Sequence, residues 1–227
     1  MLRAFALAKA YWIGQTFLAS KHAYSRSTAT LIRQVQGCNA CAAHLPLGPK
    51  PVFQFGIDAP ILLISQAPGT AAHRSGMPFD DPSGERLRRW LGVRSESFYN
   101  PAHFSLLPMG FCYPGKGKGG DLPPRPECAK LWRSQLLAQL TNVQLTLLVG
   151  AHAVNWHLHK PKQNLSDLVA DWHSRWPDTV VLPHPSPRNT YLLRQRPWIE
   201  ETLVPMVRER VADLLGSSNI TPWAERS

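Results

Sequence analysis

The apolar residues of the chain gather in four short aliphatic runs, and longer amphipathic stretches separate these runs. The runs occupy residues 61–65, 104–108, 145–149 and 180–182. Short runs of this kind, rich in leucine or β-branched residues, predict strands that are buried on both faces of a sheet. The stretches 84–91, 127–140, 151–158 and 165–172 instead repeat apolar residues at helical spacing. The alternation predicts an α/β fold, a three-layer sandwich with a central four-stranded parallel sheet and helices on both faces.

A long helix is predicted at the end of this pattern, from Pro197 to Leu215. Its apolar stripe consists of Ile199, Leu203, Val207, Val211 and Leu214. Because proline lacks a backbone N–H, Pro205 is expected to kink or restart this helix. We divide the chain into an extension of unknown role at 1–28, one domain at 29–216 and a flexible tail at 217–227.

The charge of the chain narrows the class of partner. Its formal charge is +10, from 25 Lys and Arg against 15 Asp and Glu, and the first acidic residue is Asp58. This excess favours a polyanionic partner, above all nucleic acid. No apolar segment reaches the roughly 20 residues that a membrane-spanning helix needs. We therefore expect a soluble, cytoplasmic, monomeric protein that binds DNA and no membrane.

Unusual sequences follow all four predicted strands. They are Gln66–Gly69, Met109–Cys112, Gly150–His152 and Pro183–Asn189. In open α/β sheets the ligand crevice lies at the carboxyl ends of the strands. We therefore expect these four segments to converge on one site.

The four cysteines indicate a metal centre. They are Cys38, Cys41, Cys112 and Cys128, which form a C-x2-C pair and a second pair with fifteen residues between its members. Two such pairs in a chain without a clear secretory signal argue against a disulfide framework. Zinc and a [4Fe-4S] cluster both accept four thiolates, and the spacing alone does not separate them. Free buried cysteines are the remaining alternative.

Taken together, the cysteine spacing, the Gln66-Ala-Pro-Gly69 turn and His184-Pro-Ser-Pro187 resemble the uracil-DNA glycosylase superfamily. The resemblance is to its iron–sulfur enzymes, families 4 and 5, and covers about residues 31–215. It implies a monofunctional DNA glycosylase of base excision repair. Such a hydrolase flips a deaminated base out of the duplex and cleaves its N-glycosidic bond, and uracil is the leading candidate for this base. It also implies a structural [4Fe-4S] cluster on the four cysteines, with zinc as the alternative.

The resemblance assigns roles to residues of the predicted site. His184 would donate a hydrogen bond to the departing base, and Phe79 would stack on it. Asp80 or Asp81 would place the attacking water, although Asp81 can equally be the N-cap of the helix that follows. The remaining predicted contacts to the flipped nucleotide and its phosphates are Gln66, Ala67, Pro68, Gly69, Met109, Ser186, Arg188 and Asn189. Arg188 lies where the family inserts a wedge into DNA.

Two positions depart from the family pattern. Pro108 replaces the asparagine that recognises uracil in family 4, so backbone groups around Met109 and Gly110 would have to serve instead. Ala67 stands where some members have an aspartate. These changes leave open a broader range of bases, such as deaminated purines, or a catalytically silent DNA-binding module. The glycine–lysine stretch 114–120 is expected to be a flexible basic loop that contacts phosphates.

Overall fold

Four parallel strands lie side by side at the centre of the computed structural model, which describes residues 25–159 and 164–216. They are β1 (Ile61–Ile64), β2 (Phe104–Leu106), β5 (Leu145–Val149) and β6 (Thr179–Leu182), in the order β2-β1-β5-β6. Leu63 of β1 pairs with Leu106 on one side and Leu147 on the other. All four predicted strands are therefore confirmed, as is their parallel arrangement.

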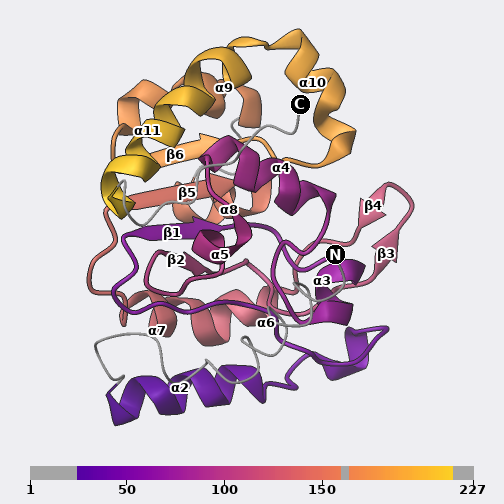
Figure 1. Cartoon of the computed structure of the whole chain (residues 1–227). Helices are drawn as coiled ribbons and strands as arrows, with labels where there is room; N and C mark the ends of the chain where they lie inside the picture. The colour runs from indigo at the N-terminus through magenta and orange to yellow at the C-terminus, as the bar shows by residue number, and fades with distance from the viewer. Residues whose placement is uncertain (1–24, 160–163, 217–227) are drawn as a thin grey trace, which may run out of the picture.

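Helices flank this sheet on both faces, which confirms the three-layer α/β sandwich (Figure 1). The α-helices are α2 (Arg26–Gln36), α3 (Thr70–Ser75), α4 (Pro82–Leu91), α5 (Ser95–Phe98), α6 (Pro126–Cys128), α7 (Ser134–Leu137), α8 (Ala151–His157), α9 (Leu165–Ala170), α10 (Thr190–Gln195) and α11 (Val204–Leu215). Three 3-10 turns are η1 (Ala42–His44), η3 (Trp172–Arg175) and η4 (Pro187–Asn189), and two π turns are η2 (Ala129–Arg133) and η5 (Ile199–Leu203). Helix α4 packs against α11, and α8 packs against β5.

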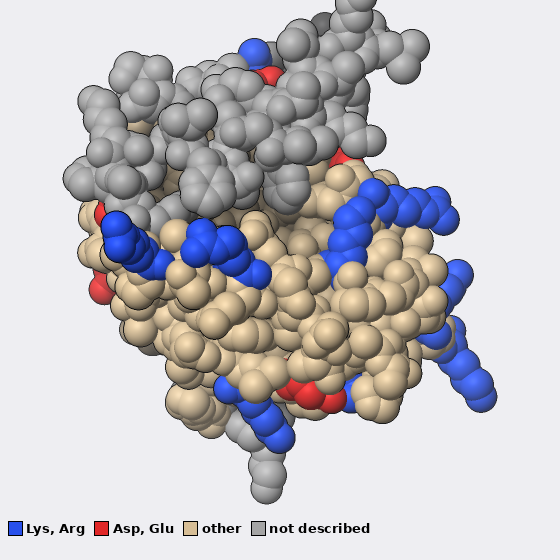
Figure 2. Space-filling view, turned by 90° about the horizontal axis from the view of Figure 1, so that it is seen from below, with Lys and Arg blue, Asp and Glu red and all other residues tan. Residues whose placement is uncertain are grey.

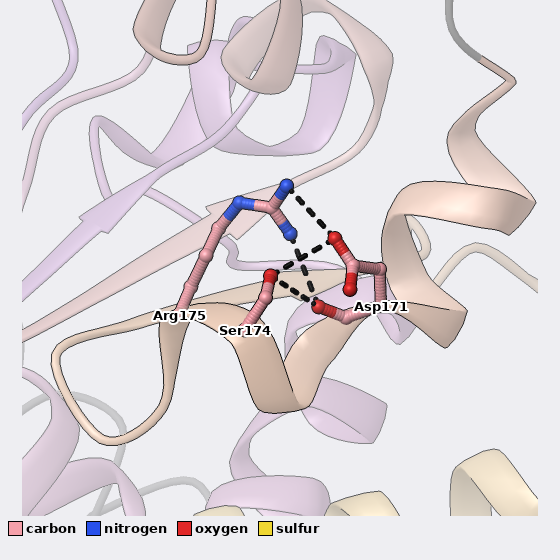
Figure 3. Close-up of polar contacts among 3 residues, drawn as sticks. All are labelled: Asp171, Ser174 and Arg175. Carbon is pink, nitrogen blue, oxygen red and sulfur yellow. Dashed lines mark hydrogen bonds and ion pairs between the residues drawn. The ribbon is translucent and has the colours of Figure 1, made fainter.

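Local sequence explains where several helices begin and end. Pro205 lies in the first turn of α11, directly after the π turn η5, so the predicted restart of this helix is confirmed. Asp171 ends α9. Its carboxylate accepts a hydrogen bond from the Ser174 hydroxyl (2.9 Å) and forms an ion pair with Arg175 (3.2 Å), as Figure 3 shows. This cluster of three residues fixes the short turn η3 that leads into β6.

The glycine–lysine stretch differs from its prediction. Lys116–Gly117 forms strand β3 and Gly120–Asp121 forms strand β4, and the two pair as an antiparallel hairpin (Figure 1). The expected irregular loop is therefore wrong, because backbone pairing orders this segment despite its lack of apolar side chains. Lys116 and Lys118 are both exposed on the hairpin.

On the face seen in Figure 2, Lys and Arg side chains lie in several separate groups, while Asp and Glu occupy fewer places. None of the helices described here is both long enough and apolar enough to cross a membrane. Residues 1–24 and 217–227 lie outside the described residues, so the division into extension, domain and tail stays a prediction.

Candidate functional site

A cavity of about 400 Å³ lies where β1, β2 and β6 end. Its walls are formed by Ser65, Gln66, Ala67, Pro68, Gly69, Ala72, Pro78, Phe79, Asp81, Ser83, Pro108, Gly119, Gly120, Asp121, His184, Ser186, Arg188 and Asn189. The predicted segments after β1 and β6 thus converge at this cavity, whereas after β2 only Pro108 lines it and the predicted segment Met109–Cys112 does not. The segment after β5 is absent from the lining, and the hairpin β3–β4 contributes to it instead.

His184 is held in a defined orientation by its own loop. The backbone N–H of Ser186 donates to His184 Nδ1 (3.2 Å), and the Asn189 amide donates to the His184 carbonyl (2.7 Å). Burial lowers the pKa of His184, and the carboxylates Asp81 and Asp121 partly oppose this shift. The ring is therefore neutral at pH 7, and because Nδ1 accepts a hydrogen bond, the proton resides on Nε2.

Residues of two other elements support this loop. Arg86 of α4 donates to the Ser186 carbonyl (3.3 Å) and to the Thr190 hydroxyl (3.4 Å). Gly150, at the end of β5, has a φ of +83°, and a Cβ placed there would lie 3.5 Å from the Cβ of His184. Glycine at this position therefore satisfies the backbone conformation beside the histidine.

Phe79, which is expected to stack on the base, contacts both the cavity and the core. Its side chain lines the cavity and also meets Phe98 of the core edge to face, with ring centroids 6.1 Å apart. Its φ of +57° is unusual for a residue other than glycine. Arg88 holds the Phe79 carbonyl by a hydrogen bond (3.2 Å), and Gly84 allows the close approach, since a Cβ there would lie 1.8 Å from that carbonyl oxygen. The surrounding structure thus maintains a strained backbone at the cavity wall.

Two carboxylates lie close to Gly69. A Cβ built on Gly69 would lie 3.4 Å from Asp121 Oδ2 and 3.9 Å from Asp81 Oδ2. Asp81 Oδ1 accepts from the Gly84 N–H (2.7 Å), so this residue is the N-cap of α4 and also lines the cavity. Asp80 is outside the lining. Asp121 was missed by the sequence analysis, although it is a lone carboxylate that directly follows the glycines of a basic stretch.

The cavity wall at Pro108 has few hydrogen-bonding groups that are available to a bound base. The N–H of Met109 donates to the Ser65 carbonyl (2.8 Å), and the N–H of Gly110 donates to the Gln66 carbonyl (3.0 Å). The Pro108 carbonyl accepts from the guanidinium of Arg133 (2.6 Å). Met109 is buried and does not line the cavity. Both N–H groups that were expected to replace the asparagine are therefore already engaged.

The hairpin β3–β4 is tied to both sides of the cavity. Gln66 donates through Nε2 to the Leu122 carbonyl (3.2 Å), and Arg188 donates through Nη1 to the Gly119 carbonyl (2.6 Å). Gly120 lies under Arg188, where a Cβ would approach Nη1 to 2.1 Å. Arg188, which the sequence placed as a DNA wedge, is exposed but here anchors the hairpin.

The four cysteines share one neighbourhood and form no disulfide. Burial raises the pKa of Cys112 to about 12 and that of Cys128 to about 11, and the neighbouring cysteines contribute to both rises. The indole N–H of Trp132 donates to Cys38 Sγ (3.2 Å). No three His, Cys, Asp or Glu side chains within 25–159 and 164–216 are arranged to hold a metal ion. Metal ligation by these cysteines therefore stays a prediction.

Comparison with known proteins places this geometry in a family. The family model described as the uracil DNA glycosylase superfamily matches residues 53–208, which include every residue of the cavity wall. The chain is also similar to the type-4 uracil-DNA glycosylase of Thermotoga maritima. The identity is 27% over 173 residues, which cover 72% of this chain and 81% of that protein. The chain belongs to the uracil-DNA glycosylase superfamily, in which it resembles the type-4 enzymes.

Proposed function

We propose that the protein is a monofunctional DNA glycosylase that hydrolyses the N-glycosidic bond of a flipped, deaminated base. The observation that carries the proposal is the neutral His184 in the cavity wall, with its Nδ1 engaged and its Nε2–H free to donate. A pyrimidine or purine that leaves a deoxyribose carries negative charge in the transition state. A fixed donor in a partly buried cavity stabilises that charge as it develops.

Each remaining step has a group in the cavity. Phe79 stacks on the base after it leaves the duplex. As the bond between the base nitrogen and C1′ breaks, the carboxylates of Asp81 and Asp121 stabilise the positive charge on the sugar. A water molecule then adds to C1′ and gives up its proton, for which Asp121 is the accepting carboxylate. Asp80 has no part in this mechanism because it is outside the cavity wall.

The basic hairpin supplies contacts to DNA. Lys116 and Lys118 are exposed on the same hairpin whose glycines 119 and 120 line the cavity. They therefore lie where the phosphates beside a flipped nucleotide pass. Arg188 joins this surface through its bond to Gly119. Ser186 and Asn189 keep the loop of His184 in place rather than reading sequence.

A [4Fe-4S] cluster on Cys38, Cys41, Cys112 and Cys128 is part of the proposal, with zinc as the alternative. The donor chemistry fits, because all four are soft thiols in one neighbourhood of the fold and one of them accepts a hydrogen bond from Trp132. When bound, the cluster supplies structural cross-linking. It would join the segment after α2 to the two ends of the hairpin insertion at residues 112 and 128.

The accepted bases extend beyond uracil in this proposal. A strict uracil enzyme needs donors and acceptors that match the edge of the base, whereas the wall at Pro108 has a proline ring and its neighbouring N–H groups are engaged. Uracil, hypoxanthine and xanthine all leave as anions that His184 can stabilise. We therefore propose deaminated bases as the substrate class, with uracil included.

A base-release assay tests the proposal. Metal-loaded protein is incubated in excess with duplexes that carry a single uracil, hypoxanthine or xanthine, and abasic sites are cleaved by alkali. Release of uracil and of at least one deaminated purine, with none from the undamaged duplex, is the expected result. Tight binding to all duplexes without release of any base would instead establish a catalytically silent DNA-binding module.

A further inference from the structure

Arg133 is a buried cation that the proposed mechanism does not use. Its side chain is only 1% exposed, and it is among the largest fully buried side chains of the protein. Its Nε atom has no hydrogen-bond partner among the described residues, and neither of the ion pairs found there involves it. Burial lowers its pKa to about 10, so the group still carries its charge at pH 7. A buried charge without an opposite charge is costly and calls for a specific explanation.

The contacts of Arg133 lead directly to the cavity. Its Nη2 donates to the carbonyls of Leu107 (2.8 Å) and Pro108 (2.6 Å), the two residues that follow β2. Pro108 itself lines the cavity. Behind the guanidinium, His157 contacts Nη1 (3.3 Å) and the Trp156 ring lies 5.4 Å away. Arg133 thus fixes the backbone of the base-facing wall from the side opposite to the cavity.

The same helical segment also reaches the cysteines. Arg133 is the last residue of the π turn η2, which begins immediately after Cys128. Its neighbour Trp132 donates to Cys38 Sγ (3.2 Å). π turns of this kind often occur at functional sites, because they change the direction of successive side chains. Here the change sends Trp132 to the cysteines and Arg133 to the cavity wall.

We propose that Arg133 is a positioning residue that fixes the Pro108 wall of the base cavity, and that the π turn η2 links this wall to the cysteine centre, because Trp132 of the same turn contacts Cys38. This inference rests on the proposed function for its effect on base release. The wall and the centre then stabilise each other. Loss of the guanidinium frees the carbonyls of Leu107 and Pro108 and loosens the turn that carries Trp132 and directly follows Cys128.

The test compares R133M and R133K with the matched control K130M, whose lysine is exposed on the same turn. Two rates are measured on metal-loaded protein, namely single-turnover base release and loss of metal to a chelator. R133M is expected to slow base release by about tenfold or more, since small displacements in a site have large kinetic effects. Its affinity for DNA should stay within about twofold of the wild type. Metal loss should become several-fold faster, R133K should recover part of both rates, and K130M should match the wild type.

Two results overturn the proposal. One is a folded R133M in which either rate equals that of the wild type, and the other is a loss of base release that follows entirely from weaker DNA binding. Should R133M fail to fold, R133K carries the test, because one ammonium group cannot reproduce the forked contacts of a guanidinium. It should then release base more slowly than the wild type, and an unchanged rate would contradict the inference. A wild-type protein that is inactive on every lesion contradicts the proposed function, while the metal-loss rates still test Arg133.

Discussion

The two walls of the cavity differ in what they offer a bound base. The His184 wall presents a side-chain donor whose orientation is set by Ser186 and Asn189. The Pro108 wall presents a proline ring, and the N–H groups of Met109 and Gly110 that follow it are engaged within the protein. This difference indicates that stabilisation of a leaving group and recognition of a base are separate tasks, carried by different walls of the cavity. In the proposed mechanism one wall performs the first task, while the other lacks the usual side-chain groups for the second.

Removal of the donor from the His184 wall should have the largest effect. His184→Ala is expected to reduce single-turnover base release by about 10²–10³-fold, the usual effect of losing one donor to a developing anion. DNA affinity should change little, because the phosphate contacts remain. His152→Ala is a matched control, since His152 lies outside the cavity wall. Equal activity of His184→Ala and the wild type would exclude this histidine from the mechanism.

The carboxylate that the hairpin contributes should rank second. Asp121→Asn is expected to slow base release by about 10–100-fold, because the amide neither accepts the water proton nor opposes positive charge on the sugar. Asp81 remains in place and limits the loss. The control is Asp213→Asn, a substitution of an exposed aspartate on α11. If Asp121→Asn is as active as this control, Asp121 only lines the cavity.

Acid should destabilise the protein through the histidine behind the Pro108 wall. Burial, the charge of Arg133 and His159 together lower the pKa of His157 from 6.5 to about 4. As the pH falls below 6.5, the unfolded chain binds this proton before the folded one, so the free energy of unfolding decreases. His157 alone should account for a loss of about 1–3 kcal/mol by pH 4.

Denaturant unfolding between pH 7 and pH 4 measures this loss. His157→Gln keeps an acceptor for Arg133 but does not titrate, so its stability should fall less steeply with pH. The other buried histidines, whose pKa values burial also lowers, contribute equally to both proteins. Parallel curves for the two proteins would show that His157 is protonated equally in the folded and unfolded states.

An amide side chain at position 108 should have the smallest effect of these substitutions. It should change the selectivity between bases rather than the overall rate of base release. Pro108→Asn is expected to raise the ratio of uracil release to hypoxanthine release by about tenfold, because an amide can both donate to and accept from uracil. Pro108→Ala should leave the ratio unchanged. A ratio that does not respond to asparagine would mean that base selection occurs elsewhere in the cavity.

The sequence predicted those parts of the structure that depend on local apolar patterns. The four strands are rich in aliphatic residues and have no competing turn signal, and the ends of β1 and β6 bring two of the four predicted motifs together. The hairpin β3–β4 was missed because its order comes from backbone pairing and from contacts with Gln66 and Arg188, which are distant in sequence. Asp121 was missed with it.

The burial of Arg133 is a second feature that could not be predicted from the sequence. An arginine in an amphipathic helix is normally exposed, and nothing in the local pattern distinguishes Arg133 from its exposed neighbour Lys130. Only the π turn η2 and the carbonyls that follow β2 make its burial possible. The engagement of the Met109 and Gly110 N–H groups likewise depends on the register between two segments, which the sequence does not reveal.

The most direct test of the difference between the walls is the selectivity of the wild-type protein. Single-turnover rates are measured on otherwise identical duplexes that carry uracil or hypoxanthine opposite the same base. If, as proposed, one wall stabilises any anionic leaving base and the other does not recognise its edge, both bases should be released, with rates within about a hundredfold of each other. Release of uracil more than about 10⁴-fold faster than hypoxanthine would contradict this account, since it requires specific recognition that the Pro108 wall does not provide.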